Sequence, residues 1–110
     1  MKKICNLSDI DDGDARGFDV VLNNESFAIV CVRQGQQVFA YQNSCPHTGV
    51  NLEWLPDQFL DDTQQYFVCS THGALFQVED GYCVSGPCHG ESLTSIAVSV
   101  EAGEIMCGID

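Results

Sequence analysis

The sequence predicts an all-β, antiparallel fold in one domain, and three observations lead to that prediction. Short segments alternate polar and apolar residues, or run apolar over the length of a strand, with turn residues between them. No segment shows a sustained helical stripe, and the best helical candidate, Asn51–Leu60, is interrupted by Pro56. The length of 110 residues fits one domain and is too short for two.

Nine strands are predicted, each bounded by turn residues. Their ranges are Ile4–Leu7, Phe18–Leu22, Phe27–Arg33, Val38–Gln42, Tyr66–Cys69, Leu75–Val78, Tyr82–Val84, Leu93–Val100 and Ile105–Cys107. The connections with turn chemistry are Asn23-Asn24, Gln34-Gly35-Gln36, Glu79-Asp80-Gly81 and Glu101-Ala102-Gly103. The long stretch without strand character runs from Cys45 to Gln65.

The charge balance indicates which partners to expect. Sixteen acidic residues against four basic ones leave a formal net charge of −12. Such a surface repels nucleic acid and anionic membranes and favours a partner with a basic patch, although acidity also serves simple solubility. Met1-Lys2-Lys3 is followed by polar residues rather than an apolar signal segment, so a cytoplasmic protein is expected. Seven cysteines, an odd number, then favour metal ligands and buried thiols over a disulfide framework.

Two short clusters carry the candidate chemistry. They are Cys45-Pro46-His47-Thr48-Gly49 and Cys69-Ser70-Thr71-His72-Gly73. Each cluster brings a thiolate and an imidazole within a few residues, in turn-like sequence near a strand end. A four-coordinate metal centre needs ligands on two loops that can approach each other, and these loops supply two pairs. Cys45, His47, Cys69 and His72 are therefore the candidate metal ligands.

The pattern Cys-x-His, twenty-one residues, then Cys-x-x-His resembles the Rieske iron–sulfur motif, and Gly86-Pro87 resembles the glycine–proline loop of that family. The resemblance implies one Rieske-type [2Fe–2S] cluster, with Cys45 and Cys69 on the inner iron and His47 and His72 on the outer one. It also implies the Rieske fold. In that fold a cluster-binding subdomain resembling a zinc ribbon, about residues 43–90, is inserted in a β base formed by residues 1–42 and 91–110.

Departures from the family pattern imply a low reduction potential. High-potential members have a disulfide between the two loops, but Val50 and Thr71 stand at the matching positions here. Those members also have serine and tyrosine hydroxyls that bond to cluster sulfurs, and Ala74 and Phe76 replace them. Because such hydrogen bonds stabilise the reduced state, their loss lowers the potential. The sequence therefore resembles a single-domain Rieske ferredoxin, which is a monomeric electron carrier between a flavin-dependent reductase and a terminal oxygenase or other redox enzyme.

Three alternatives from other classes remain. One is a redox sensor, which needs the same cluster but a slower response to a specific partner. Another is an accessory subunit like the small subunit of assimilatory nitrite reductase, although members of that group can lack the four ligands that are present here. The third is a structural zinc module, since two Cys and two His also suit tetrahedral Zn²⁺. None of these alternatives adds a catalytic residue.

The remaining cysteines and aromatic residues have packing or docking interpretations. Cys31 and Cys107 lie in strand sequence and are interpreted as buried apolar side chains, as Cys5 can be. The roles of Cys83, Cys88 and His89, which flank the proline loop, stay open, including a disfavoured Cys83–Cys88 disulfide. Phe76 is predicted to be core. An excursion at Glu53–Gln65 is predicted on the surface, where its carboxylates would attract a partner and Trp54 or Phe59 would contact it.

Overall fold

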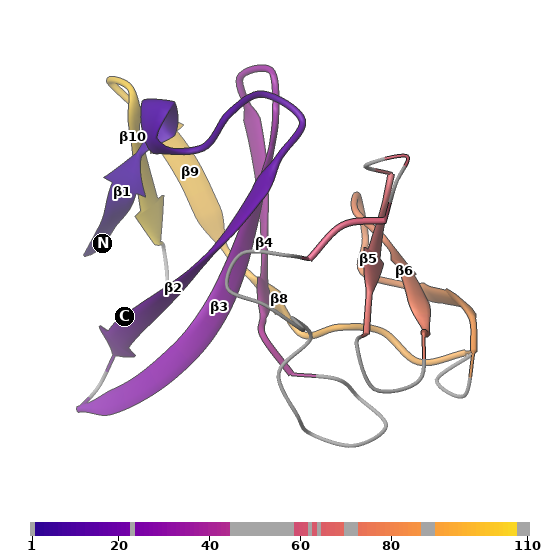
Figure 1. Cartoon of the computed structure of the whole chain (residues 1–110). Coiled ribbons are helices and arrows are strands. Elements are labelled where there is room, and N and C mark those ends of the chain that lie inside the picture. Colours follow the sequence, from indigo (N-terminus) through magenta and orange to yellow (C-terminus); the bar gives the residue numbers. More distant parts are fainter. Residues whose placement is uncertain are drawn as a thin grey trace.

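The computed structural model describes residues 2–22, 24–44, 59–61, 63, 65–69, 73–86 and 90–107, and the structural statements below concern these residues. Within them the chain forms ten strands in three antiparallel sheets and one short 3-10 helix (Figure 1). The predicted all-β, antiparallel class is therefore confirmed. In the same ranges, no helix is long and apolar enough to cross a membrane.

The strands and the helix follow one another along the chain as β1 Lys2–Asn6, η1 Leu7–Asp9, β2 Ala15–Leu22, β3 Glu25–Gln34, β4 Gln37–Gln42, β5 Tyr66–Val68, β6 Leu75–Gln77, β7 Cys83–Ser85, β8 Ser95–Ile96, β9 Val98–Glu101 and β10 Glu104–Cys107. The first sheet has the order β1-β10-β9, the second β2-β3-β4-β8, and the third β5-β6-β7. In Figure 1 the second sheet lies between the other two.

Most predicted strands differ from the observed ones by a few residues at their ends, and two of the differences have an evident physical reason. The predicted strand Leu93–Val100 is divided at Ala97 into β8 and β9, because the chain there changes its partner from β4 to β10. The predicted strand Ile4–Leu7 ends one residue early, and the 3-10 helix that follows is not predicted by the sequence pattern. The backbone N–H of Asn6 donates to the Asp9 carboxylate at 2.9 Å, which caps that helix. The predicted helical turn at 51–60 lies outside the described residues except for its last two, and Leu60 forms a β-bridge with Phe67.

Strand β3 is buried on both faces and separates two hydrophobic cores. Its residues Val30 and Val32 belong to a core shared with the third sheet, whereas Ile29 and Cys31 belong to a core shared with the first sheet. Successive side chains of a strand point to opposite faces, so a strand between two cores needs an uninterrupted apolar run. The sequence Ala-Ile-Val-Cys-Val in β3 meets that need.

Tyr41 of β4 connects the second sheet to the third. Its hydroxyl donates a hydrogen bond to the Val78 carbonyl at 2.6 Å, and its ring packs edge-on against Phe67 with the ring centroids 5.6 Å apart. Gly81 makes room for this ring, since a Cβ there would lie 2.8 Å from Tyr41 Cε1. Burial, with the negative charges of Asp80 and Glu79, raises the pKa of Tyr41 to about 12.

We expect Tyr41→Phe to lower the free energy of unfolding by about 1–3 kcal/mol, because the buried Val78 carbonyl would lose its partner. The folded-state pKa of Tyr41 is raised, so the stability of the wild type should fall as the pH rises from about 10 through about 12. The Tyr41→Phe variant lacks this ionisation, so its free energy of unfolding should fall less over the same pH range. Urea denaturation of both proteins between pH 7 and pH 11 tests this, and parallel pH profiles would contradict it.

Candidate metal centre

The second predicted ligand pair begins at the end of β5, where the structure describes Cys69. Its side chain is fully buried. Its backbone N–H donates to the Ala74 carbonyl at 2.9 Å, and its carbonyl accepts from the Gly73 N–H at 2.8 Å. These two bonds close the loop between β5 and β6. His72 lies outside the described residues, but the two ends of its loop, Cys69 and Gly73, are joined by a backbone hydrogen bond.

The first predicted pair follows β4. Cys45 and His47 lie outside the described residues, whereas the two residues that lead into their loop are described. Asn43 is buried and donates its backbone N–H to the Ala28 carbonyl at 2.8 Å, and Ser44 donates to the Gln42 carbonyl at 2.9 Å. The second sheet thereby anchors the start of this loop. In Figure 1 the C-terminal ends of β4 and β5 point to the same, lower side of the molecule.

A third segment, the start of the Gly86-Pro87 loop, lies against the β5–β6 loop. Gly86 has a φ of 101°, and a Cβ built on it would come within 2.8 Å of the Ala74 Cα atom. A side chain at this position would therefore push the two backbones apart. Gly86 and Ala74 are both singled out from the sequence, but their contact is not predicted from it. The small size of both residues was the feature of the sequence that could have indicated this contact. Pro87 lies outside the described residues.

The surroundings of Cys69 are apolar. It shares a core with fully buried side chains, namely Phe67, Ala74, Phe76, Val78 and Cys83. The prediction that Phe76 belongs to the core is confirmed, and Phe76 lies opposite Phe67 in the sheet register. An isolated thiolate would be costly in such a place, whereas a thiolate bound to a cationic metal centre is compensated. The buried cysteine thus fits the iron side of an iron–sulfur cluster, for which soft thiolates are suitable ligands.

One surface prediction is wrong. The sequence places Phe59 in a surface excursion at Glu53–Gln65, but this side chain is 1% exposed and packs in the same core as Cys69. Its carbonyl accepts the N–H of Val68 at 2.8 Å, and the following residue, Leu60, bridges to Phe67. The end of the excursion therefore packs along β5 instead of leaving the protein. Trp54 lies outside the described residues.

The other described cysteines behave as packing residues. Cys5, Cys31 and Cys107 are free and buried, as predicted for Cys31 and Cys107 and left open for Cys5. Burial, with the neighbouring thiols Cys5 and Cys107, raises the pKa of Cys31 to about 12, so this thiol stays protonated. In the described ranges, no three Cys, His, Asp or Glu side chains are placed to hold a metal ion.

Cys83 is a free, buried thiol on β7. It donates a weak hydrogen bond to the Ser85 carbonyl at 3.3 Å. Its neighbours in the predicted proline-loop region, Cys88 and His89, lie outside the described residues. Cys83 and Cys69 are thus two fully buried cysteines of the same core, and of these two only Cys69 belongs to a predicted ligand motif.

The described residues form a small all-β fold in which the first residue of the second Cys/His motif, Cys69, is a buried thiol. The sequence model of the Rieske [2Fe-2S] domain matches residues 1–105, and the chain therefore belongs to this family. The cofactor of this family is a [2Fe–2S] cluster. The comparison with curated proteins finds no match.

Solved structures of similar fold include ferredoxins. The ferredoxin of carbazole 1,9a-dioxygenase from Nocardioides aromaticivorans IC177 aligns with a TM-score of 0.77 and 23% identity, over 98% of this chain and 96% of its own. The Sphingomonas yanoikuyae B1 ferredoxin aligns with a TM-score of 0.72 and 21% identity, over 96% and 94%. A chain in a complex of reduced oxygenase and oxidised ferredoxin of carbazole 1,9a-dioxygenase aligns with a TM-score of 0.73 and 27% identity, over 96% and 89%.

Proposed function

We propose that this protein is a Rieske ferredoxin, which carries single electrons from a flavin-dependent reductase to a terminal oxygenase or a similar redox enzyme. The observation that carries the proposal is the alignment of this chain, over nearly the whole length of both aligned chains, with a ferredoxin of a dioxygenase and with a chain in a complex of oxygenase and ferredoxin. Reduction by a flavin reductase and reoxidation by an oxygenase, followed in one stopped-flow experiment, test it. A chain that is reduced but never reoxidised by any oxygenase would favour a redox sensor.

Four residues would hold the cluster. We assign Cys45 and Cys69 to the inner iron and His47 and His72 to the outer iron, on the strength of the paired motif and of the buried Cys69 thiol. A bound Rieske cluster takes up and releases one electron. The apolar core around Cys69 would exclude water from the thiolate side, while the hydrogen bonds that close the loop between Cys69 and Gly73 would hold the ligand backbone in place.

The proposal includes a division of the chain. Residues 43–90 form the cluster-binding subdomain, and residues 1–42 and 91–110 form the β base. Support comes from the sheets, because the third sheet contains only strands between Tyr66 and Ser85, whereas the first two sheets contain only strands outside that range. We further propose a cytoplasmic monomer that binds neither nucleic acid nor membrane, which agrees with a net charge of −12.

The reduction potential should be low. Ala74 and Phe76 are fully buried beside Cys69 and carry no hydroxyl that could donate to sulfur. We expect a potential near the bottom of the Rieske range of about −150 to +300 mV, and a measured value above roughly +150 mV would contradict this. Phe76→Tyr should raise the potential by some tens of millivolts, since it restores a donor. Phe18→Tyr, which alters the other core, is the control and should leave the potential unchanged.

The charge distribution supports docking through electrostatic attraction. All four Lys and Arg residues lie within the first 33 residues, whereas residues 34–110 contain ten of the sixteen carboxylates. A basic partner surface would therefore be drawn to the part of the chain that carries the ligands. We expect electron transfer to the oxygenase to slow as salt rises from low to physiological strength, where screening acts over about 8–10 Å. A rate that does not depend on salt would remove electrostatic steering from the proposal.

Asp61 limits how this docking can be tested by mutation. Its carboxylate accepts hydrogen bonds from the Thr63 hydroxyl at 2.8 Å and from the backbone N–H of Gln65 at 3.2 Å, so it caps the turn before β5. Desolvation acts to raise the pKa of Asp61, but these hydrogen bonds outweigh it and lower the pKa. Charge reversal at Asp61 would remove the hydrogen bonds that cap the turn and would also change the charge, so the two effects could not be told apart. Asp61→Asn is the better variant, since the amide oxygen can still accept these bonds.

A further inference from the structure

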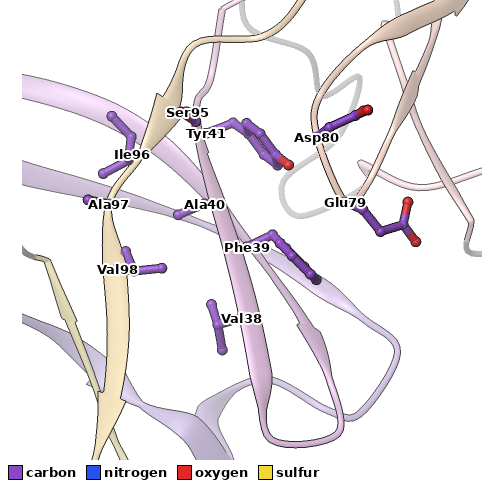
Figure 2. Close-up of a pocket in the computed structure, with 10 residues that line it drawn as sticks. All are labelled: Val38, Phe39, Ala40, Tyr41, Glu79, Asp80, Ser95, Ile96, Ala97 and Val98. Atoms are coloured by element: carbon purple, nitrogen blue, oxygen red, sulfur yellow. The ribbon is translucent and has the colours of Figure 1, made fainter.

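A groove of about 370 Å³ lies at the junction of the three sheets (Figure 2). One wall is formed by residues 38–41 of β4, and another by residues 95–98, where β8 passes into β9. The turn between β6 and β7 contributes Glu79 and Asp80. In Figure 2 the aromatic rings of Phe39 and Tyr41 point toward this turn, whereas the smaller side chains of Val38 and Ala40 lie on the side of β8 and β9.

The groove contains an incomplete sheet edge. Strand β8 is only two residues long and pairs with Ala40 and Tyr41, so the first half of β4 has no partner on that side within the described residues. The N–H of Gln42 donates to the Thr94 carbonyl, which shows that this residue turns its backbone groups toward β8. Alternation along a strand gives Val38 the same orientation, so its N–H and C=O face the groove. An extended peptide can add to such an edge.

The groove is also electronegative. Glu79 is exposed, and no hydrogen bond or ion pair joins its carboxylate to another described residue. The Asp80 carboxylate accepts a hydrogen bond from the backbone N–H of Tyr82 at 2.9 Å. Its negative charge lies beside Glu79 in the lining of the groove. The negative charges of Asp80 and Glu79 help to raise the pKa of Tyr41, in addition to its burial. The apolar floor and the charged rim together suit an occupant that alternates apolar and basic side chains.

We propose that this groove is a second docking surface, which binds an extended, basic segment of the redox partner by strand addition to β4. The inference rests on the proposed function for the nature of the partner. The β6–β7 turn lies at the opposite end of β6 from Gly73, the last residue of the loop that carries His72, so an occupant of the groove sits at the other end of this strand. The partner could then be held in place while the ligand side exchanges electrons.

A second copy of this chain is a poor occupant, because it has few cations to offer. Lys3 is paired with the Glu104 carboxylate at 2.9 Å, and the Arg33 guanidinium donates to the Ile10 and Gly35 carbonyls. Residues from 34 onward contain no Lys or Arg. The partner must therefore supply the positive charge.

The test uses the oxidised holoprotein and a short capped peptide in which lysine and valine alternate, with a glutamate–valine peptide as the probe control. We expect the lysine peptide to shift the backbone NMR signals of Val38, Ile96 and Val98, and the glutamate peptide to shift none. Glu79→Gln should weaken binding about two- to fivefold, as loss of one exposed ion pair does. Glu25→Gln removes the same charge at the β2–β3 end and should change nothing. Ala97→Arg, at an exposed groove residue, should abolish binding.

Three results would overturn the groove proposal. They are equal weakening by Glu79→Gln and Glu25→Gln, shifts confined to residues next to the ligand loops, and absence of binding. The reduction potential and the Rieske EPR signal of the wild type keep the two proposals apart, and normal values in the Ala97→Arg protein show that this variant is folded and holds its cluster. If the potential and the EPR signal of the wild type are normal but the lysine peptide does not bind to it, the groove proposal alone fails. If neither signal appears in the wild type, the proposed function fails whatever the peptide does.

Discussion

Cys69→Ala protein is expected to lack the Rieske EPR signal completely and to contain less than about a tenth of the wild-type iron. In the proposed ligand assignment, this variant removes one of the two thiolates on the inner iron, and the imidazole ligands cannot replace it. Cluster binding also stabilises the folded form, so the variant should unfold at a lower denaturant concentration. Iron analysis, EPR after dithionite reduction and urea denaturation measure these three effects.

Cys83→Ala is the matched control for this experiment. Cys83 is as deeply buried as Cys69 and lies in the same core, but it belongs to no Cys/His motif of the predicted ligands, and its thiol donates to the Ser85 carbonyl. We expect Cys83→Ala to keep a full EPR signal and to lose roughly 1 kcal/mol of stability, as a small core truncation does. An intact signal in Cys69→Ala, or an equal loss in both variants, would show that the ligand assignment is wrong. Zinc in place of iron in the wild type would favour the structural zinc module instead.

Gly86→Ala is expected to have the second largest effect, a loss of about 2–4 kcal/mol of stability together with faster loss of iron. Two costs add in this variant. A φ of 101° is unfavourable for any residue with a Cβ, at about 1–2 kcal/mol. The new Cβ would also lie 2.8 Å from the Ala74 Cα, a backbone atom that cannot turn aside, so the proline loop must move away from the loop that follows Cys69. Urea denaturation and the rate of iron release to a chelator measure the two effects.

Gly90→Ala separates the two costs. Gly90 has a similar φ of 93°, but no atom of another described residue lies within 4 Å of a Cβ built on it. It should therefore show the conformational cost alone, about 1–2 kcal/mol, with iron release unchanged. If both variants release iron at the wild-type rate, the contact between Gly86 and Ala74 does not hold the cluster-binding loops together.

Much of this protein follows from local sequence. The pairing of Cys45 with His47 and of Cys69 with His72 depends on residue type and spacing, which is why the amino-acid sequence is enough to predict the family and its cofactor. Strand β3 is predictable for a similar reason, since an unbroken apolar run between turn residues suits a strand buried on both faces. The turn at Asn24 is predicted too, and its φ of 66° is a conformation that asparagine tolerates well.

Other features depend on contacts between distant segments, and only the tertiary structure decided them. Phe59 has the sequence surroundings of a loop residue. Its burial depends on the pairing of Phe59 and Leu60 with strand β5. The division of the predicted strand at Ala97 depends on which partner strand is available on each side of it. The contact between Gly86 and Ala74 likewise joins two loops that neither composition nor spacing connects. The sequence alone determined which residues can bind a cluster, because ligand chemistry belongs to side chains and their local spacing. The packing of the three sheets decided what surrounds those residues, because burial is a property of the whole folded chain.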